Sequence, residues 1–379
     1  MSSGSYNFID LFSGCGGLSL GMEHAGFNLI FASDFDRYAC ETFRCNHSIS
    51  PNDVYEGDIR TLNNHIADYT DRFKDVALVC GGPPCQGFSN ANRNHRLIDD
   101  PRNVLYKEYL KFLKEVRPKF FLIENVRGMA KKIDEIKEDI RTYLGDEYDV
   151  DYTLLNAKDF GVPQNRVRFI LIGNRIGLSS KLLLHNIVEY SSECPRFTLE
   201  DAIGDLPELK PNTVKNNTGR EGEDIGFTSI GYTYKDTEFR RFINGDRKIE
   251  VLFNHKNRYN QPRDVEIFKR LPQGANSLDP SIADIMPYKR RNDVFTDKYY
   301  RLVPDTICKT ITAHMQNDCN MYIHPTQPRG LSPREAARIQ TFPDDFEFQG
   351  PMNKWYRQIG NAVPVKLAEA IGKELIRYL

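Results

Sequence analysis

The sequence predicts an α/β fold in which a parallel sheet is followed by a region of different character. In the first 175 residues, short apolar runs alternate with longer stretches of helical periodicity, which is the pattern of βαβ units. From about Leu184 this alternation stops, and the stretch 210–226 is too polar to build a core. We therefore expect a domain boundary near residue 184.

The expected strands are the short runs that are richest in apolar residues. They are 7–12, 28–33, 76–80, 120–123 and 166–172, with a short edge strand at 54–55. The expected helices carry apolar residues at helical spacing, and they are 18–25, 37–46, 104–116 and 133–144. Near the end of the sequence, 363–378 has the pattern of an amphipathic helix, with apolar Val363, Leu367, Ala370, Ile371 and Leu375.

Composition excludes several classes of protein. Of 379 residues, 40% are hydrophobic and 27% are charged, which fits a globular chain and neither a disordered nor a collagen-like one. No apolar run approaches the roughly 18 residues that span a bilayer, and the first ten residues lack the features of a signal peptide. We expect a cytoplasmic protein whose eight cysteines, none in a C-x-x-C pair, are free thiols and bind no metal.

One segment is locally basic although the formal net charge of the chain is -1. Residues 239–270 carry nine Lys and Arg against four Asp and Glu, a net of +5, interleaved with aromatic residues. Such a segment suits a phosphate backbone. The alternative is a solvated face that happens to be basic.

A glycine-rich turn follows the first expected strand. The sequence SGCGG at 13–17 lies between a strand and a helix, where a ligand can approach the backbone. About 20 residues later the next strand ends in Asp34 and Phe35, where an acid can bind ribose hydroxyls and a ring can stack on adenine. Asp58 follows the next strand end. This series favours a nucleoside-cofactor site, whereas the turn alone could be an ordinary tight turn and Asp58 alone a surface residue.

Two reactive side chains are expected at the same edge of the sheet. Cys85 follows a buried strand and a Gly-Gly-Pro-Pro turn, whose prolines would hold it on a stiff exposed turn as a nucleophile. Glu124 follows the next apolar strand and can act there as an acid. The alternative for Glu124 is a capping or ion-pair role, and the other cysteines suit small buried hydrophobic positions.

Five motifs occur in order along the chain: DLFSGCGGLSLG (10–21), GGPPCQGFS (81–89), ENV (124–126), QNRVR (164–168) and RQIGNAVP (357–364). Together they resemble the DNA cytosine-5 methyltransferases, of the prokaryotic or phage restriction-modification type or an orphan type. The resemblance covers 7–175 and 301–379. It implies a Rossmann-like S-adenosylmethionine-dependent sheet in 1–183 plus 353–379, with a smaller target-recognition domain, 184–352, inserted.

The resemblance implies that S-adenosylmethionine methylates C5 of a flipped cytosine in a short specific sequence of double-stranded DNA, through a covalent bond from Cys85 to C6. Glu124 would bind the N3 and amino edge of the base and Arg168 its carbonyl, with Arg166 in the same pocket and Gln164 as a support. The cofactor contacts carried over by position are Phe12, Gly14, Cys15, Gly16, Gly17, Leu18, Asp34, Phe35, Asp58, Ile59, Pro84, Leu105, Asn361 and Val363.

DNA contacts are expected in two regions. The stretch 86–103 suits a lid over the flipped base, with Gln86, Ser89, Arg93, Arg96 and Arg102 as contacts. In the recognition region the candidates are Arg240, Arg241, Asn254, Arg258, Asn260, Gln261, Arg290, Arg291 and Thr310. The stretch 329–346 resembles the motif that organises this region, and we expect it to act as a scaffold and not in catalysis. The alternative is an ordinary helix that begins after Ser332 and Pro333.

The expected partner is double-stranded DNA, bound by a monomer in the cytoplasm or nucleoid. A cognate restriction endonuclease would act on the same site without a stable complex, or the protein would act alone. Three other assignments are disfavoured by the sequence. The tRNA-methylating branch of the family carries a Cys-Phe-Thr tripeptide that does not occur in this sequence, and a non-catalytic relative would have lost the Pro-Cys or Glu motif. A Rossmann oxidoreductase would need G-x-G-x-x-G.

Overall fold

The structure is a computed structural model that describes residues 6–84, 104–215, 219–233, 235–287 and 296–379. It divides into two compact units. The first consists of Met1–Gly161, Arg166–Pro195 and Ala362–Leu379, and the second of Val162–Asn165 and Arg196–Asn361. In the described part, no helix is both long and apolar enough to cross a membrane.

The unit boundaries differ from the boundaries expected from the sequence. Residue 183 lies inside helix α6 (Ser180–Tyr190), which belongs to the first unit. This helix buries Leu183, Leu184 and Ile187 and contacts strand β6, so it continues the sheet-and-helix unit past the expected boundary. Residue 353 lies inside α11 (Met352–Asn361), which belongs to the second unit.

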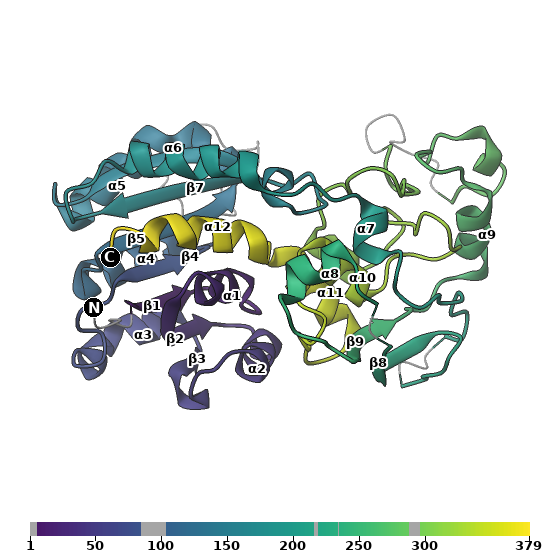
Figure 1. The fold of residues 1–379 in the computed structure, drawn as a ribbon, viewed down its shortest axis with the longest axis horizontal. Coiled ribbons are helices and arrows are strands. Elements are labelled where there is room, and N and C mark those ends of the chain that lie inside the picture. Colours follow the sequence, from purple (N-terminus) through teal and green to yellow (C-terminus); the bar gives the residue numbers. More distant parts are fainter. Residues whose placement is uncertain (1–5, 85–103, 216–218, 234, 288–295) are drawn as a thin grey trace. The chain divides into compact units, whose positions relative to one another are not determined.

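A seven-stranded sheet forms the centre of the first unit, in the order β3-β2-β1-β4-β5-β7-β6 (Figure 1). The strands are β1 (Tyr6–Leu11), β2 (Phe27–Asp34), β3 (Val54–Glu56), β4 (Leu78–Gly81), β5 (Phe120–Val126), β6 (Asp149–Asn156) and β7 (Val167–Asn174). The first five run parallel, as expected, and β3 is the expected edge strand.

The other end of the sheet was not predicted correctly. Strand β7 runs antiparallel to both β5 and β6, whereas the sequence suggested a parallel strand, and β6 was missed. Strand β6 lies at the edge of the sheet and buries only Leu155. Strand β6 therefore lacks the apolar run that marks a central strand. Because β6 was missed, the antiparallel direction of β7 could not be predicted.

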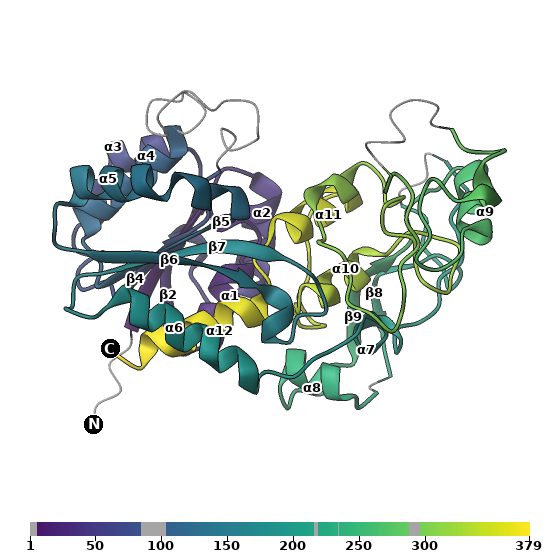
Figure 2. The same ribbon diagram turned by 90° about the horizontal axis from the view of Figure 1, so that it is seen from above.

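Helices cover both faces of the sheet (Figure 2). On one face lie α3 (Ile59–Asn64), α4 (Val104–Val116) and α5 (Ile133–Leu144), and on the other lie α1 (Gly17–His24), α6 and α12 (Val365–Ile376). Helix α2 (Arg37–Asn46) joins β2 to the short helical turn before β3. Both layers are needed because the strands of a parallel sheet are apolar on both faces.

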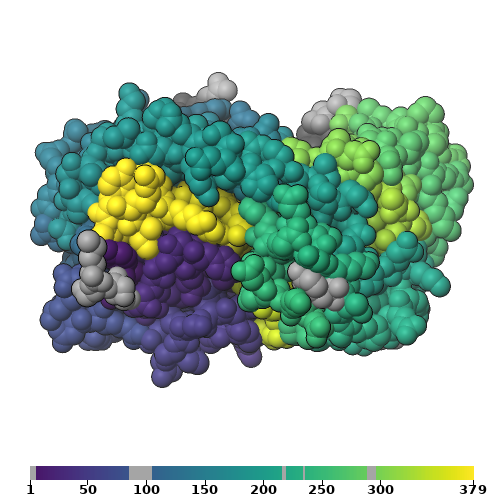
Figure 3. Space-filling model, in the orientation of Figure 1, coloured from purple at the N-terminus to yellow at the C-terminus, as the bar shows by residue number. Residues whose placement is uncertain are grey.

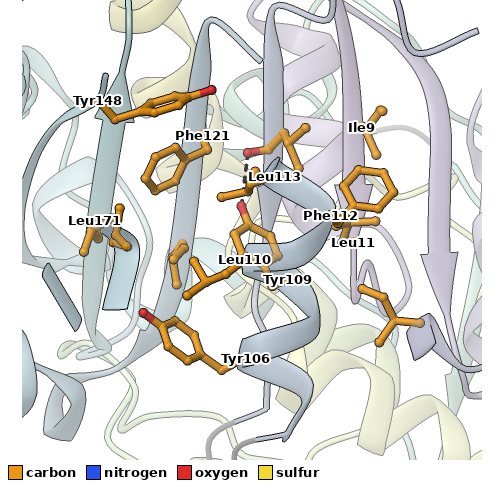
Figure 4. Packing of buried hydrophobic residues seen from close by; sticks show 14 of the residues in the cluster. Ile9, Leu11, Tyr106, Tyr109, Leu110, Phe112, Leu113, Phe121, Tyr148 and Leu171 are labelled. Atoms are coloured by element: carbon orange, nitrogen blue, oxygen red, sulfur yellow. Dashed lines mark hydrogen bonds between the residues drawn. The ribbon is translucent and has the colours of Figure 1, made fainter. Parts of the chain in front are cut away.

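One apolar core of this unit lies between the sheet and α4 (Figure 4). Its members include Ile9, Leu11, Tyr106, Tyr109, Leu110, Phe112, Leu113, Phe121 and Leu171, all with zero exposure. The Tyr109 hydroxyl lies 3.2 Å from the carbonyl oxygen of Val79 and 2.9 Å from that of Leu122, and donates to them. The one polar atom of this side chain is thus satisfied inside the core.

Helix α12 covers the opposite face and lies beside α1, from the other end of the sequence (Figure 3). The approach is close because glycines face the contact. A Cβ atom on Gly21 would lie 2.4 Å from the Cβ of Ala368, and one on Gly372 would lie 2.7 Å from the Cβ of Ala25. The five apolar residues expected to form the buried face of 363–378 are all buried, which confirms the amphipathic helix.

The second unit is organised around a small antiparallel sheet and short helices. These are β8 (Gly226–Gly231), β9 (Val251–Lys256), α7 (Leu199–Ile203), α8 (Glu238–Asn244), α9 (Pro262–Arg270), α10 (Pro333–Ile339) and α11. Helix α10 begins where expected, and Ser332 and Glu335 form a capping box at its first turn.

Buried charges hold α10 in place. The Arg329 guanidinium makes two hydrogen bonds to the Glu335 carboxylate, at 2.8 and 2.6 Å. Although burial alone would raise the pKa of Glu335, Arg329 holds it below its usual value. Arg338 pairs with Asp344 and Asp205, and its side chain has zero exposure. Breaking one partner of such a pair is costly, so this part of the chain is rigidly specified.

A Gly21→Ala substitution tests the dependence of the first unit on the α1 and α12 contact. The new methyl group would meet Ala368 and the backbone of Glu369 within 2.6 Å, so we expect the unfolding free energy to fall by about 3 kcal/mol or more. Thermal unfolding measures this. Gly231→Ala is the matched control, because nothing lies within 4 Å of its added methyl group; equal midpoints for the two variants would contradict the prediction.

Candidate active site

The glycine-rich turn after β1 has an unusual backbone. Phe12, Gly14 and Gly16 have φ angles of 59°, 57° and 95°, in the region that L side chains rarely adopt. The turn is held to the end of β2, because the Ser13 amide donates to the carbonyl oxygen of Ser33 at 3.0 Å. A strained non-glycine residue such as Phe12 persists only where the surroundings enforce it, as happens at binding sites.

Asp34, at the end of β2, holds this turn in place through hydrogen bonds to its carboxylate. Its Oδ2 accepts a hydrogen bond from the Gly14 amide, and its Oδ1 accepts one from the Asp36 amide, both at 2.8 Å. Burial raises the pKa of the Asp34 carboxyl. The adjacent ring of Phe35 is 77% exposed, and a Cβ on Gly14 would meet nothing within 4 Å. The Asp34 carboxylate therefore adjoins Phe35 in the sequence and contacts the open backbone of Gly14 in the structure.

Asp58 has a structural partner in addition to its expected role. It is the N-cap of α3, accepts a hydrogen bond from the Arg60 amide at 2.8 Å, and pairs with the Arg60 guanidinium. The hydrogen bond from Arg60 lowers the pKa of Asp58. Ile59, which follows it, is buried. The contact of Asp58 and Ile59 with a cofactor stays a prediction.

The remaining expected cofactor residues differ in exposure. Cys15, Gly17, Leu18 and Val363 are buried, Leu105 is partly buried, and Pro84 and Asn361 are exposed. Burial raises the pKa of the Cys15 thiol to about 12, so it stays protonated at neutral pH. Asn361 belongs to the second unit and Val363 to the first.

Asp10 lies in β1 directly before the turn and was not singled out from the sequence. Its carboxylate has zero exposure and accepts a hydrogen bond from the Ser19 hydroxyl of α1, while its Oδ1 has no hydrogen-bond partner among the described residues. Burial raises the pKa of Asp10 to about 7. The sequence did offer a signal for Asp10, since it is an acid inside an apolar strand. Burying a charged group is costly, so an acid at such a position is unusual.

Glu124 and Arg168 form a nearly buried ion pair at the same edge of the sheet. The antiparallel register pairs Glu124 with Ile170, so Arg168 lies diagonally across from Glu124 on the same face. Arg168 Nε is 2.9 Å from Glu124 Oε1, and the two side chains are 13% and 12% exposed. The structure therefore brings together the two residues that the sequence assigned to one pocket.

The turn that leads to Cys85 lies against this pair. A Cβ on Gly82 would be 3.2 Å from Glu124 Oε2, and the Asn125 side chain donates to the Pro83 carbonyl oxygen at 2.8 Å. The ENV and GGPPC motifs thus contact each other. Cys85, Gln86, Ser89, Arg93, Arg96 and Arg102 lie outside the described residues.

Arg166 and Gln164, expected in the catalytic pocket, are buried and bonded to backbone and to other side chains. Arg166 Nη2 donates to the Ala362 carbonyl oxygen at 2.8 Å, just before α12. Gln164 donates to Gln340 Oε1 at 2.9 Å and accepts from the Ile311 amide at 2.8 Å, within the second unit. Their exposures are 1% and 0%, and the part of Arg166 and Gln164 in the catalytic pocket stays a prediction.

Two of the expected DNA contacts are core residues. The Arg240 side chain has zero exposure, lies 3.2 Å from Asp344 and donates to the Ile249 carbonyl oxygen. Asn254 is equally buried and exchanges two hydrogen bonds with the backbone of Phe348. A buried guanidinium or amide cannot reach a phosphate or a base edge, so the structure corrects both assignments.

Other members of the recognition set have partners but are not fully buried. Arg258 donates to the carbonyl oxygens of Met315 and Asn317 at 2.7 and 2.6 Å, and Thr310 donates to that of Asn165 at 2.6 Å. Arg241 is exposed and pairs with Asp236. Arg290 and Arg291 lie outside the described residues.

The basic segment 239–270 presents less charge than its composition suggests. Ion pairs within the second unit join Arg240 to Asp344, Arg241 to Asp236, Arg247 to Asp345, Lys256 to Glu221, Arg263 to Asp264, and Arg270 to Glu266 and Asp284. Its net charge of +5 is therefore partly internal to the fold, and a phosphate-binding role for the segment stays a prediction.

The mainly parallel sheet carries the strained glycine-rich turn, Asp34 and Glu124 near the carboxyl ends of parallel strands, and Arg168 reaches Glu124 from the start of the antiparallel β7. This arrangement defines a Rossmann-like methyltransferase fold. The family model of the C-5 cytosine-specific DNA methylases matches residues 6–377, and the chain belongs to this family. The family and the enzyme class expected from the five motifs are thereby confirmed.

Individual relatives agree with this assignment. The chain is 34% identical over 387 residues to the type II methyltransferase M.XorII of Xanthomonas oryzae pv. oryzae, covering 98% of this chain and 84% of the relative. A prophage-encoded protein of E. coli, described as a DNA modification methyltransferase, superposes with a TM-score of 0.76 at 28% identity, over 98% of this chain and 99% of the other. The S. pombe Dnmt2 methyltransferase, at 17% identity and a TM-score of 0.56 over 99% of each chain, shares the fold.

An Arg168→Met substitution tests the importance of the ion pair. It keeps a long side chain but leaves the Glu124 carboxylate nearly buried without its partner, which typically costs about 3 to 5 kcal/mol. Chemical denaturation measures the loss. The control is Arg141→Met, which removes the exposed pair with Asp146 and should cost less than about 1 kcal/mol; comparable losses would contradict a special role for the buried pair.

An Asp10→Asn substitution tests the buried carboxyl group through pH. The folded protein keeps the Asp10 proton up to about pH 7, whereas the unfolded chain loses it near pH 4, so wild-type stability falls as the pH rises through this interval. The variant lacks this penalty, so its free energy of unfolding relative to that of the wild type should rise by up to about 4 kcal/mol between pH 4 and pH 8. Denaturation midpoints across this range measure the gain; Asp71→Asn, on the surface, is the control, and a gain that does not change with pH would refute the assignment.

Proposed function

We propose that the protein transfers a methyl group from S-adenosylmethionine to C5 of a flipped cytosine within a short specific sequence of double-stranded DNA. The observation that carries the proposal is the nearly buried pair of Glu124 and Arg168, which lies against the turn leading to Cys85. Membership of the C-5 cytosine-specific DNA methylase family supports it.

The residues around the glycine-rich turn fit a nucleoside cofactor. Gly14 leaves room for close approach of a ligand to the backbone, Asp34 can accept ribose hydroxyls on its remaining lone pairs, and the exposed Phe35 ring can stack on adenine. When bound, S-adenosylmethionine supplies an electrophilic methyl group. Among the described residues, the same edge of the sheet carries the Glu124 and Arg168 pair, so donor and acceptor would meet there.

Cys85 and Glu124 share the activation of cytosine in this proposal. The Cys85 thiolate adds to C6, and the electron pair of the C5–C6 bond makes C5 nucleophilic. Glu124 hydrogen-bonds the N3 and amino edge and stabilises the charge that develops in the ring, while Arg168 orients Glu124 and faces the base carbonyl. After methylation, the C5 proton passes to solvent, its electron pair re-forms the C5–C6 double bond, and the C6–S bond breaks with Cys85 leaving as the thiolate, which restores the aromatic ring.

The base must leave the helix for this chemistry, since C5 and C6 of a stacked cytosine are not accessible along the required direction. Flipping costs roughly a few kcal/mol, which contacts to the phosphates and to the opened site must offset. We assign the covering of the site to 86–103 and sequence recognition to the second unit, with Arg241, Arg258 and Thr310 as the remaining described candidates.

The names of the relatives support a biological setting for this proposal. M.XorII is named a type II methyltransferase, and the chain covers most of its length. We assign this protein to the same setting, as a monomer in the cytoplasm that protects DNA against a restriction endonuclease acting independently on the same sequence.

The proposal predicts transfer of labelled methyl groups from S-adenosylmethionine to unmethylated genomic DNA, confined by bisulfite sequencing to cytosine in one short motif. Cys85→Ala should lower the rate by at least about a thousandfold, because the base is no longer activated. Cys45→Ala, at an exposed cysteine of α2, is the matched control and should keep the wild-type rate.

Bulk transfer RNA is the second substrate to be tested in parallel. Label in transfer RNA alone would replace DNA as the substrate in this proposal, and label in neither would refute the enzymatic assignment. An active Cys85→Ala variant would refute the covalent step while leaving the methyl transfer intact.

A further inference from the structure

A buried histidine packs against the glycine-rich turn, and neither the five motifs nor the chemistry above assigns it a role. His47 follows α2 and is 6% exposed. A Cβ atom built on Gly16 would lie 2.0 Å from its Nε2 and 2.9 Å from its Cδ2 and Cε1. The imidazole therefore packs directly against the backbone of Gly16, and only glycine fits there.

The other side of the imidazole is held by an acid on α1. His47 Nδ1 is 2.5 Å from Glu23 Oε2, and the His47 side chain has zero exposure against 22% for Glu23. The ring also stacks on Phe43 of α2, with centroids 4.0 Å apart and an angle of 21° between the planes. With one nitrogen bonded and one face stacked, the ring has a single orientation, and the edge it presents to Gly16 is defined.

Gly16 and Glu23 lie seven residues apart, which is about two helical turns, so they are on the same side of α1. Gly16 is the N-cap of that helix and has a φ of 95°. His47 contacts both positions at once, and it thereby joins the turn, the helix that follows the turn, and the end of α2. A displacement of the ring would shift Gly16 and, through it, the strained backbone from Phe12 onward.

We propose that His47, oriented by Glu23, is a positioning residue for binding of the methyl donor: its imidazole sets the position of Gly16 and so the shape of the turn. This inference rests on the proposed use of S-adenosylmethionine. It predicts that His47 contributes to donor affinity, and much less to the rate once the donor is bound, because the contacts described above join His47 to Gly16, Glu23 and Phe43.

The test is calorimetric binding of S-adenosylhomocysteine to the full-length protein, together with KM for S-adenosylmethionine and kcat on DNA. His47→Ala should weaken binding and raise KM by about tenfold or more, with kcat changed by less than about threefold. Glu23→Gln should show a smaller effect in the same direction, because the ring keeps its stack on Phe43 but loses its charged partner.

Two conservative variants separate the contacts of the ring. His47→Gln can return a polar atom near the position of Nε2 beside Gly16, and should restore part of the affinity. His47→Asn can return only the partner of Glu23, near Nδ1, and should remain as weak as His47→Ala. His24→Asn is the matched control. Like Glu23, His24 is on α1, and like His47 it faces a carboxylate, that of Glu369 at 3.6 Å, but it does not contact the turn.

The outcomes discriminate between the explanations. If the wild-type protein binds S-adenosylhomocysteine and the His47→Ala variant binds it equally well, the inference about His47 is overturned while the proposed donor stands. A loss by His47→Ala that His24→Asn reproduces, or that tracks the fall in thermal midpoint across the variants, would also overturn it, since a general packing role explains both. Absence of binding to the wild-type protein would overturn the proposed donor, and the inference with it.

Discussion

The close packing of α1 against α12 is the contact on which the arrangement of the chain depends. Gly21 and Gly372 let the two helices approach until backbone and Cβ atoms touch, and no larger residue fits at either position. Because α12 comes from the far end of the sequence, this contact closes the first unit after the whole second unit has been inserted between α6 and α12. Arg166 strengthens the closure by bonding the chain at Ala362, where it re-enters the first unit.

The reversal of β7 determines the chemistry at the edge of the sheet. In a parallel sheet, the strand beside β5 would bring its carboxyl end to Glu124. Since β7 is antiparallel, its first residues lie there instead, and Arg168 reaches the carboxylate from the start of its strand. Glu124 would otherwise be buried without a partner, and it thereby gains a cation next to the turn that leads to Cys85, the proposed nucleophile. Charges interact strongly there because little water separates them.

Local signals in the sequence predicted most of the sheet and several of the residues that the structure brings together at its edge. The glycine-rich turn, Asp34 and Glu124 were identified because each follows an apolar run directly, and chain order places such residues at one edge. Strand β6 could not be found this way, since an edge strand shows little apolar periodicity. Arg240 and Asn254 were misassigned because charge and polarity suggested exposure, whereas their partners, Asp344 and Phe348, are about a hundred residues away in the sequence and reveal themselves only in the fold.

The insertion of one unit into the other has a consequence for synthesis on the ribosome. By the time residues 6–195 have been made, the sheet has all seven strands, yet the face of α1 around Gly21 still lacks its cover. The nascent chain must carry this uncovered apolar surface while the entire second unit emerges, and only then does α12 supply Leu367, Ile371 and Leu375 to bury it. Chaperone demand should therefore be greatest during translation of residues 196–361, and a ribosome that stalls there would release a chain whose first unit is unfinished.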